Sequence, residues 1–320
     1  MPSTSRRTAH GLPGFPSRSR PMRVVEARFP RWRDSIVGPY LMLAPAVLLL
    51  VVMILMPLVL VAATAFTDWH LGGGPPRFVG LETFRALLED HDFQVAVWNT
   101  ARYVGAVVPV TTLAGLAVAL LIAECGRGQA LYRMIFFLPS VATLAAMSVA
   151  WQMLLSPSVG AVPQVLRLLG FAPGNWLQDP QAALPTLAMI GIWSEAGFAM
   201  LFFLAGLKTV PHELVEAVAL DGRGSVVDRL WHVTLPHLAP ITVFVLVFSS
   251  IHALRVFDTV AIITRGGPEK ATLVALYFIY QEAFSLFRTN LAAAATILFI
   301  AVVLALSLAQ LYATRAGRSR

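Results

Sequence analysis

The sequence has few charged residues and a single cysteine. Only 13% of its 320 residues are charged and 57% are hydrophobic, whereas soluble proteins average about 25% charged residues. A soluble domain of this size needs more polar residues on its surface than this composition contains. The composition also excludes a disordered chain, and the lone Cys125 excludes an intramolecular disulfide. The chain is therefore predicted to be a membrane protein.

Several enzyme motifs are also missing. No G-x-x-x-x-G-K-[ST] run occurs, so the chain has no P-loop to bind ATP phosphates, and no G-x-S-x-G elbow of a hydrolase occurs. His212-Glu213 opens a zinc-like H-E-x-x pattern, but Glu216 stands where the second histidine would be. The lone G-x-G at Gly222 and Gly224 follows no predicted strand, so it is interpreted as a helix cap and not a dinucleotide site. We therefore expect neither an enzyme nor a metal site.

Six charge-poor runs are long enough to cross a membrane. A hydrocarbon core of about 30 Å needs about 20 apolar residues in a helix. We predict an all-α integral membrane protein with six transmembrane helices. They cover approximately residues 40–66, 98–123, 132–155, 184–207, 238–264 and 290–313.

The positive charges alternate between the connections. Residues 1–35 hold eight arginines against two acids, and the segments predicted to be cytoplasmic hold sixteen Lys and Arg residues against six in the opposite loops. The positive-inside rule places both termini in the cytoplasm. The net charge of +7 is thus interpreted as an orientation signal, with membrane lipid and not nucleic acid beside the tail. The first apolar run is too long for a cleaved signal peptide.

Two connections are predicted to carry structure. The acidic, turn-rich segment 67–97 is predicted to lie outside, with a short helix over Glu82–Leu88. The segment 208–237 lies on the basic side and is predicted to form two short helices, 212–220 and 225–233, joined by a corner at Gly222. The second helix is expected to end before Leu235-Pro236.

The second of these connections carries a recognisable motif. The run Glu216-Ala-Val-Ala-Leu-Asp-Gly222, followed by Val233-Thr-Leu-Pro236, resembles the EAA motif of permease subunits in binding-protein-dependent ABC importers. The resemblance implies coupling helices that seat in a groove of the ATPase subunit. The implied coupling residues are Glu216, Ala217, Val218, Asp221, Gly222 and Arg223.

This sequence departs from the family's motif at two points. Val218 replaces the second alanine, and ten residues separate Gly222 from Val233, one more than in the family pattern. One extra residue would rotate the second half by about 100° in a continuous helix.

Other stretches are similar to the carbohydrate-uptake branch of that family (MalF-like and UgpA-like permeases) and follow its order along residues 39–313. They are Phe66-Thr-Asp-Trp69, Phe78-Val-Gly-Leu-Glu82, Phe136-Phe-Leu-Pro139, Phe203-Leu-Ala-Gly-Leu207, Val256-Phe-Asp258 and Thr264-Arg-Gly-Gly-Pro268. The resemblance implies the MetI-like architecture of type I importer permeases. The expected parts are a basic tail over 1–38, a first helix with its external loop over 39–97, the permease core over 98–313 and a cytoplasmic end over 314–320.

The resemblance also implies partners and a location. A homologous permease would complete the pathway, two ATPase subunits would bind below it, and an extracytoplasmic solute-binding protein would bind above it. No cofactor is expected on this chain, because ATP and Mg would bind the ATPase partner. The expected location is the bacterial inner membrane. The expected solute is a sugar or a related compound, with glycerol 3-phosphate as the alternative.

Ionisable residues within membrane spans are candidates for the translocation path, because burying them in lipid is costly. Arg255 and Asp258 are three residues apart, which predicts one helical face and a possible ion pair. Each could instead have a structural role. The other path candidates are Glu195, Trp193 and His252, with Trp151, Gln152 and Asn99 as weaker ones.

Two other classes of protein share some of these features. An ion-coupled secondary transporter would have inverted repeats and broken helices in matching halves, and neither is evident in this sequence. A membrane-embedded enzyme would have a catalytic cluster at one depth, and the sequence offers none.

Overall fold

The computed structural model describes residues 37–211, 213–214 and 225–318. The chain divides into two compact units, Met1–Met56 and Pro57–Arg320. Regular structure in the described residues is helical, apart from one isolated bridge between Thr67 and Phe78. This architecture confirms the prediction of an all-α chain.

The described part of the first unit is a helix, α1 (Val37–Leu50), followed by the π-helical turn η2 (Val51–Leu55). The turn is closed by a hydrogen bond from the Met56 N–H to the Val51 carbonyl. Pro57 follows directly. A wider turn at this place accommodates a proline, which has no N–H and whose ring would clash with the carbonyl four residues earlier.

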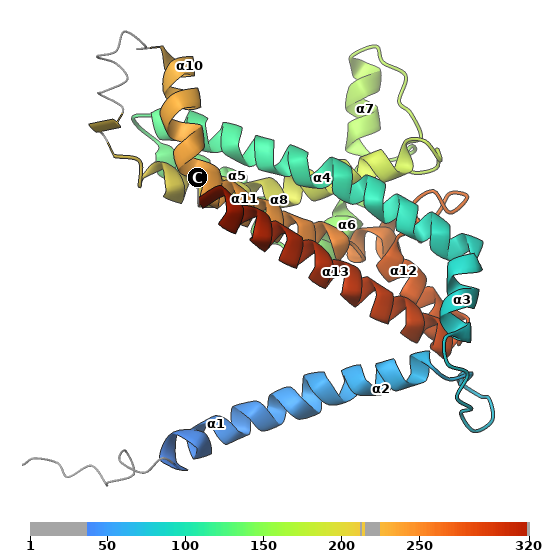
Figure 1. The fold of residues 1–320 in the computed structure, drawn as a ribbon. Helices are drawn as coiled ribbons and strands as arrows, with labels where there is room; N and C mark the ends of the chain where they lie inside the picture. Colours follow the sequence, from blue (N-terminus) through green and yellow to red (C-terminus); the bar gives the residue numbers. More distant parts are fainter. Residues whose placement is uncertain (1–36, 212, 215–224, 319–320) are drawn as a thin grey trace, which may run out of the picture. The chain divides into compact units, whose positions relative to one another are not determined.

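The second unit contains the remaining helices (Figure 1). They begin with α2 (Met56–Ala65), α3 (Glu82–Glu89), α4 (His91–Glu124), α5 (Gln129–Val141), α6 (Leu144–Leu154), α7 (Ala161–Leu168) and α8 (Ala183–Leu207). They continue with α10 (Val226–Arg229), η3 (Leu230–Thr234), α11 (Leu235–Leu254), η4 (Val260–Thr264), α12 (Ala275–Tyr280), η5 (Gln281–Ser285) and α13 (Thr289–Arg318). The short helix predicted before the second span is confirmed as α3.

Five helices among the described residues are long and apolar enough to cross a membrane, and a bent pair makes a sixth if it is counted as one span. The bent pair is α5 and α6, where the prediction was one span over 132–155. Their axes differ by 96°. The chain is extended at Ala142 and Thr143, and the Ser140 hydroxyl donates to the Ser194 carbonyl of α8 at 2.6 Å, which holds the end of α5 against α8. Hydropathy depends on composition and not on the direction of the helix axis, so it does not indicate the bend between α5 and α6.

The fifth predicted span is displaced along the sequence. One continuous apolar helix runs over Val227–Leu254, whereas the prediction was 238–264. The predicted break before Leu235-Pro236 is wrong, because η3 is closed by a hydrogen bond from the Leu235 N–H to the Leu230 carbonyl and passes without interruption into α11. As before Pro57, a π-turn precedes the proline and lets the helix continue.

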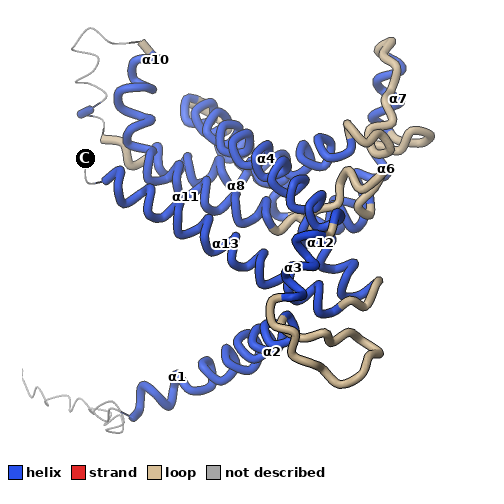
Figure 2. Tube along the Cα trace, turned by 45° about the vertical axis from the view of Figure 1, so that its right-hand side comes forward, coloured by secondary structure: helices blue, strands red, loops and turns tan. Residues whose placement is uncertain are grey.

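Helix α8 lies at the centre of the second unit, against α4, α5 and α11. Helices α4, α8, α11 and α13 run side by side in both views (Figure 1 and Figure 2). Three glycines of α8 permit this packing, since a Cβ at each of them would collide with a different neighbouring helix. At Gly191 it would meet the hydroxyl of Tyr103 on α4, at Gly197 the Ser140 Oγ of α5 and at Gly206 the Leu238 side chain of α11. Small residues at such contacts are typical of membrane helices.

Helix α4 contributes a glycine of its own. A Cβ on Gly115 would lie 2.9 Å from the backbone of Ala199 and Met200, whereas a Cβ on Gly105 of the same helix would meet nothing within 4 Å. We expect Gly115→Ala to destabilise the protein by about 1–3 kcal/mol through overpacking. Gly105→Ala should leave stability unchanged or raise it slightly, since alanine favours a helix.

The thermal unfolding temperature of the protein in detergent measures both effects. The two variants change the same residue type in the same helix, so they differ only in the space around the new methyl group. Equal unfolding temperatures would show that the contact between α4 and α8 is looser than described.

Candidate functional site

The predicted coupling segment lies between α8 and α10. Its core residues fall outside the described part of the chain, and they are Glu216, Ala217, Val218, Asp221, Gly222 and Arg223. Their roles therefore remain predictions. The structure describes the two flanks, which are residues 208–211 with 213–214 on one side and the chain from Ser225 on the other.

The two flanks are held at one end of the second unit. The Thr209 hydroxyl, just beyond α8, lies 3.2 Å from Nε2 of His237, near the start of α11. Arg229 of α10 forms an ion pair of 3.2 Å with Glu124, the last residue of α4. The ends of α4, α8 and α11 thus lie together at the two flanks of the coupling segment.

The π-turn η3 bears on the extra residue of the motif. A π-turn closes from residue i to residue i+5, so it holds one residue more than an α-turn. η3 lies between Gly222 and the Leu235-Pro236 pair. One inserted residue can be taken up in this wide turn, so the sequence C-terminal to the turn need not rotate by about 100° as it would in an uninterrupted α-helix.

Two of the predicted path residues meet across α8 and α11. Nδ1 of His252 lies 3.6 Å from Oε1 of Glu195. The Glu195 side chain is 17% exposed and that of His252 is 47% exposed. The second carboxylate oxygen of Glu195 is buried and has no hydrogen-bond partner in the described residues. A polar group with unused hydrogen-bonding capacity therefore lies within the apolar helices.

Aromatic rings form a row along α8 and α11 that reaches the His252 ring. Trp193 packs edge to face on Trp151 of α6, with 5.4 Å between ring centroids, and the His252 ring lies 4.4 Å from that of Phe248. Four phenylalanines continue the row along α8 and α11, and none of them was predicted as a site residue. They are Phe198, Phe202, Phe244 and Phe248. Their spacing of four residues within each helix is a signal that composition alone does not reveal.

Arg255 and Asp258 do not form the predicted pair on a helical face. α11 ends at Leu254, Arg255 is its C-cap residue, and the chain leaves the helix before Asp258. None of the ion pairs within the described ranges joins the two residues. The helical spacing rule failed here because the helix stops before the second residue is reached.

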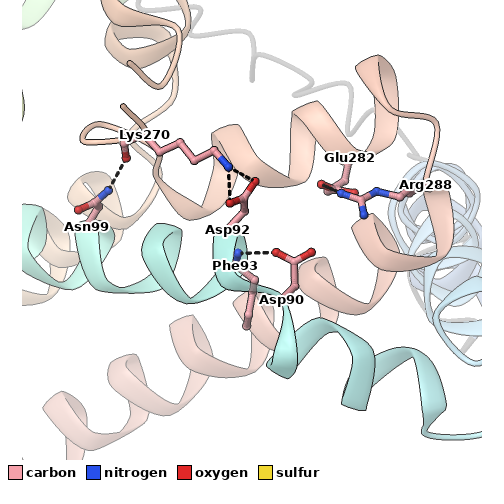
Figure 3. A network of polar contacts seen from close by, with 7 residues as sticks. All are labelled: Asp90, Asp92, Phe93, Asn99, Lys270, Glu282 and Arg288. Atoms are coloured by element: carbon pink, nitrogen blue, oxygen red, sulfur yellow. Dashed lines mark hydrogen bonds and ion pairs between the residues drawn. The ribbon is translucent and has the colours of Figure 1, made fainter. Parts of the chain in front are cut away.

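A polar network fixes the opposite end of the second unit (Figure 3). The amide of Asn99, on α4, donates to the carbonyls of Lys270 and Leu273 at 3.0 Å each. The ammonium of Lys270 contacts both oxygens of Asp92 at 2.5 and 2.7 Å. The Thr100 hydroxyl accepts the N–H of Ala275 at 2.8 Å. Asn99, a weak path candidate by sequence, is thus a structural residue that ties the segment after η4 to α4.

A second ion pair lies in the same network. Arg288 contacts Oε1 of Glu282 at 2.6 Å, and the Glu282 side chain is 2% exposed. Burial raises the pKa of Glu282, and the adjacent Arg288 opposes that shift. The pair joins η5 to the start of α13, so the segment 265–288 is held at both of its ends.

Replacing Asn99 by leucine should release this segment. The change removes two hydrogen bonds and leaves the carbonyls of Lys270 and Leu273 without that donor, at a cost of about 1–3 kcal/mol. We expect a lower unfolding temperature and faster tryptic cleavage after Arg265 and Lys270.

The matched control is Gln94→Leu, which changes an exposed amide of the same helix. It should leave the cleavage rate near that of the wild type. Equal rates for both variants would contradict the assigned role of Asn99.

Comparison with known proteins gives a consistent match. Residues 112–316 match the family described as "Binding-protein-dependent transport system inner membrane component". The sulfoquinovosyl glycerol transport system permease protein SmoG of Agrobacterium fabrum is 32% identical over 288 residues, which cover 88% of this chain and 93% of that protein. The sn-glycerol-3-phosphate transport system permease protein UgpA of Salmonella typhimurium is 31% identical over 275 residues, which cover 85% and 92%.

A solved structure has the same fold. It is the crystal structure of a bacterial ABC transporter involved in the import of the acidic polysaccharide alginate, and the match covers 89% of this chain and 97% of that one. The TM-score is 0.78 at 24% sequence identity. The similarity extends well beyond the segment that matches the family and includes most of the described helices.

Proposed function

Because the chain belongs to the family of binding-protein-dependent transport system inner membrane components, we propose that it forms half of the pathway of an ATP-driven importer for a carbohydrate or a related solute. The observation that carries this proposal is the family match over residues 112–316, which includes the predicted coupling segment. An ion-coupled secondary transporter or a membrane-embedded enzyme has no such support. The chain is a transport subunit and ATP is hydrolysed on a separate subunit.

The partners follow from the mode of transport. A second, homologous permease would complete the pathway, two ATPase subunits with ATP and Mg would bind the coupling segment, and a solute-binding protein would deliver the solute. One alginate transporter structure contains its periplasmic binding protein loaded with a pentasaccharide. Closure of the ATPase pair would then move the helices by rigid-body rocking.

The arrangement of the loops in the second unit supports its predicted division into a cytoplasmic and an external end, and both termini are proposed to be cytoplasmic. Segments predicted to be cytoplasmic meet at one end of the second unit, where Arg229 contacts Glu124. Segments predicted to be external meet at the other end, where Lys270 contacts Asp92 and the Thr289 hydroxyl donates to the Trp69 carbonyl. We assign residues 1–38 as a basic tail, 39–97 as the first helix with its external loop, 98–313 as the permease core and 314–320 as a cytoplasmic end.

The translocation path is proposed to follow the aromatic row of α8 and α11. Glu195 and His252 lie on it, since they meet across the two helices and the His252 ring packs on Phe248. Trp193 of α8, which packs on Trp151, is proposed to border the path as well. Rings offer apolar faces to a sugar, and the carboxylate and imidazole offer hydrogen bonds to its hydroxyls. Arg255 and Asp258, at the end of α11, are proposed to border the same path at its outer part.

The solute is proposed to be a sugar or a sugar derivative. The similar proteins are named for sulfoquinovosyl glycerol and for sn-glycerol 3-phosphate, and the solved transporter is described as importing alginate. Glycerol 3-phosphate is the second candidate for this chain, since the exposed Arg255, which is proposed to border the path, would attract an anion.

Two substitutions in the coupling segment test the importer assignment. We expect Glu216→Lys or Gly222→Leu, in the chain expressed with its ATPase and partner permease, to lower ATP-driven uptake at least roughly tenfold and to weaken assembly. A reversed charge and a bulky side chain at these positions would disturb the contact with the ATPase. Uptake and co-purification of the ATPase are the measurements.

Glu89→Lys is the control for the charge reversal, because Glu89 is an exposed glutamate of α3 at 69% side-chain exposure. It should leave uptake and assembly as they are. If both coupling variants also retain uptake and assembly, the coupling assignment is wrong.

A third substitution tests the path. Glu195→Gln keeps the shape of the side chain and removes its charge, and hydrogen bonds to charged groups contribute about 1.5–3 kcal/mol. We therefore expect uptake at saturating binding protein to fall about tenfold while the subunits still assemble. Glu269→Gln, at an exposed position, is the control. Unchanged uptake by Glu195→Gln would limit Glu195 and His252 to a structural role.

A further inference from the structure

A groove separate from the aromatic row lies at the end that carries the external loops. Its volume is about 360 Å³, and it is bordered by the end of α6, the turn over residues 175–178 and the segment after η4. Its polar lining consists of amides and hydroxyls only, from Gln152, Ser156, Asn175, Gln178 and Thr264.

The groove has unused hydrogen-bonding groups of both kinds. Asn175 donates through Nδ2 to Oε1 of Gln178 at 2.6 Å, which leaves Asn175 Oδ1 as an acceptor and Gln178 Nε2 as a donor. No hydrogen bond within the described residues involves the side chain of Gln152, so its donors and its acceptor are free. Paired donors and acceptors are what vicinal hydroxyls of a sugar require, since each hydroxyl both donates and accepts.

The groove carries no charge, in contrast to its neighbour. A cavity of about 320 Å³ on the other side of the turn at Gly267 is lined by Asp92, Arg265, Lys270 and Glu282. In that cavity Lys270 is already paired with Asp92. Leu177 and Ile263 add apolar surface to the uncharged groove, which suits the C–H face of a sugar ring.

The groove is connected through α6 to a helix of the proposed path. Gln152 follows Trp151, whose ring packs on Trp193 of α8, the helix that also carries Glu195. A solute released at the external end would meet the groove before it reaches the aromatic row. The position therefore fits an entry point to the pathway.

We infer that this groove is an outer subsite that binds the hydroxyl groups of a carbohydrate through the amides of Gln152, Asn175 and Gln178. The inference rests on the proposed function and names a contact made before the solute reaches Glu195 and His252. The subsite binds hydroxyl groups, so a charged group elsewhere on the solute is not recognised in this groove.

The test uses the complete importer in nanodiscs, without its binding protein, and calorimetric titration with maltose, maltotriose and xylotriose. The double variant Gln152→Met/Gln178→Met keeps the side-chain volume and removes the hydrogen-bonding groups. Loss of two hydrogen bonds of ordinary strength should weaken sugar binding about tenfold. The control Gln164→Met, at an exposed position of α7 outside the groove, should bind like the wild type. Inorganic phosphate, an anion without sugar hydroxyls, should not displace the sugars.

Any other result would contradict the proposed subsite. Equal affinities of wild type and double variant would show that the amides do not contact sugar, and displacement by phosphate would indicate an anion site. When the binding protein is then added, loss of its stimulation of ATP hydrolysis in the double variant without loss of sugar affinity would make the groove a protein contact. In these three cases the importer assignment stands as long as ATP-driven uptake persists in the wild type. If the wild type binds none of the three sugars, the subsite fails, and failure of ATP-driven uptake as well would overturn the proposed function.

Discussion

The close approach of three helices to the glycines of α8 is the constraint on which the second unit depends. Gly191, Gly197 and Gly206 each admit a different neighbour, from α4, α5 and α11. In lipid, apolar side chains gain nothing by leaving one hydrocarbon for another, so van der Waals contact at short range has to hold the helices together. A side chain at any of the three positions would force one neighbour outward, and both the aromatic row and the bend between α5 and α6 would shift with it.

The same helices connect the two functional ends. α4 has 34 residues and is therefore about 51 Å long, well beyond the hydrocarbon thickness of about 30 Å. Its first turn carries Asp92 in the external network, and its last residue is Glu124, which contacts Arg229 beside the coupling segment. A displacement at the coupling end can thus reach the external end through one rigid element that packs along α8.

Much of this fold could be predicted from the sequence, because the runs of apolar residues are long and the loop charges alternate. The prediction failed where backbone geometry and not composition decides the outcome. The break at Ala142 and Thr143 lies within an apolar run, and the end of α11 at Leu254 falls inside one, so hydropathy could reveal neither. The π-turn before Pro236 likewise reversed the expectation that a proline ends a helix.

For the candidate site, single residues were predicted better from the sequence than contacts between residues. Glu195 and His252 were identified singly, as polar residues in apolar runs, and the structure brings them together across two helices. The pairing of Arg255 with Asp258 was inferred from spacing and failed, because spacing has this meaning only inside a helix. The phenylalanine row and the uncharged groove combine distant segments, such as Gln152 with Thr264, and no local pattern indicates such combinations.

The bend between α5 and α6 has a consequence for hydration. Neither helix is long enough by itself to cross about 30 Å of hydrocarbon, and the extended residues Ala142 and Thr143 between them are exposed on the surface of this chain. Carbonyl and amide groups freed at such a break are not tolerated against lipid tails. This face of the chain must therefore border either water or another protein, which divides the perimeter of the molecule into a dry side facing the acyl chains and a wet or protein-covered side at the break.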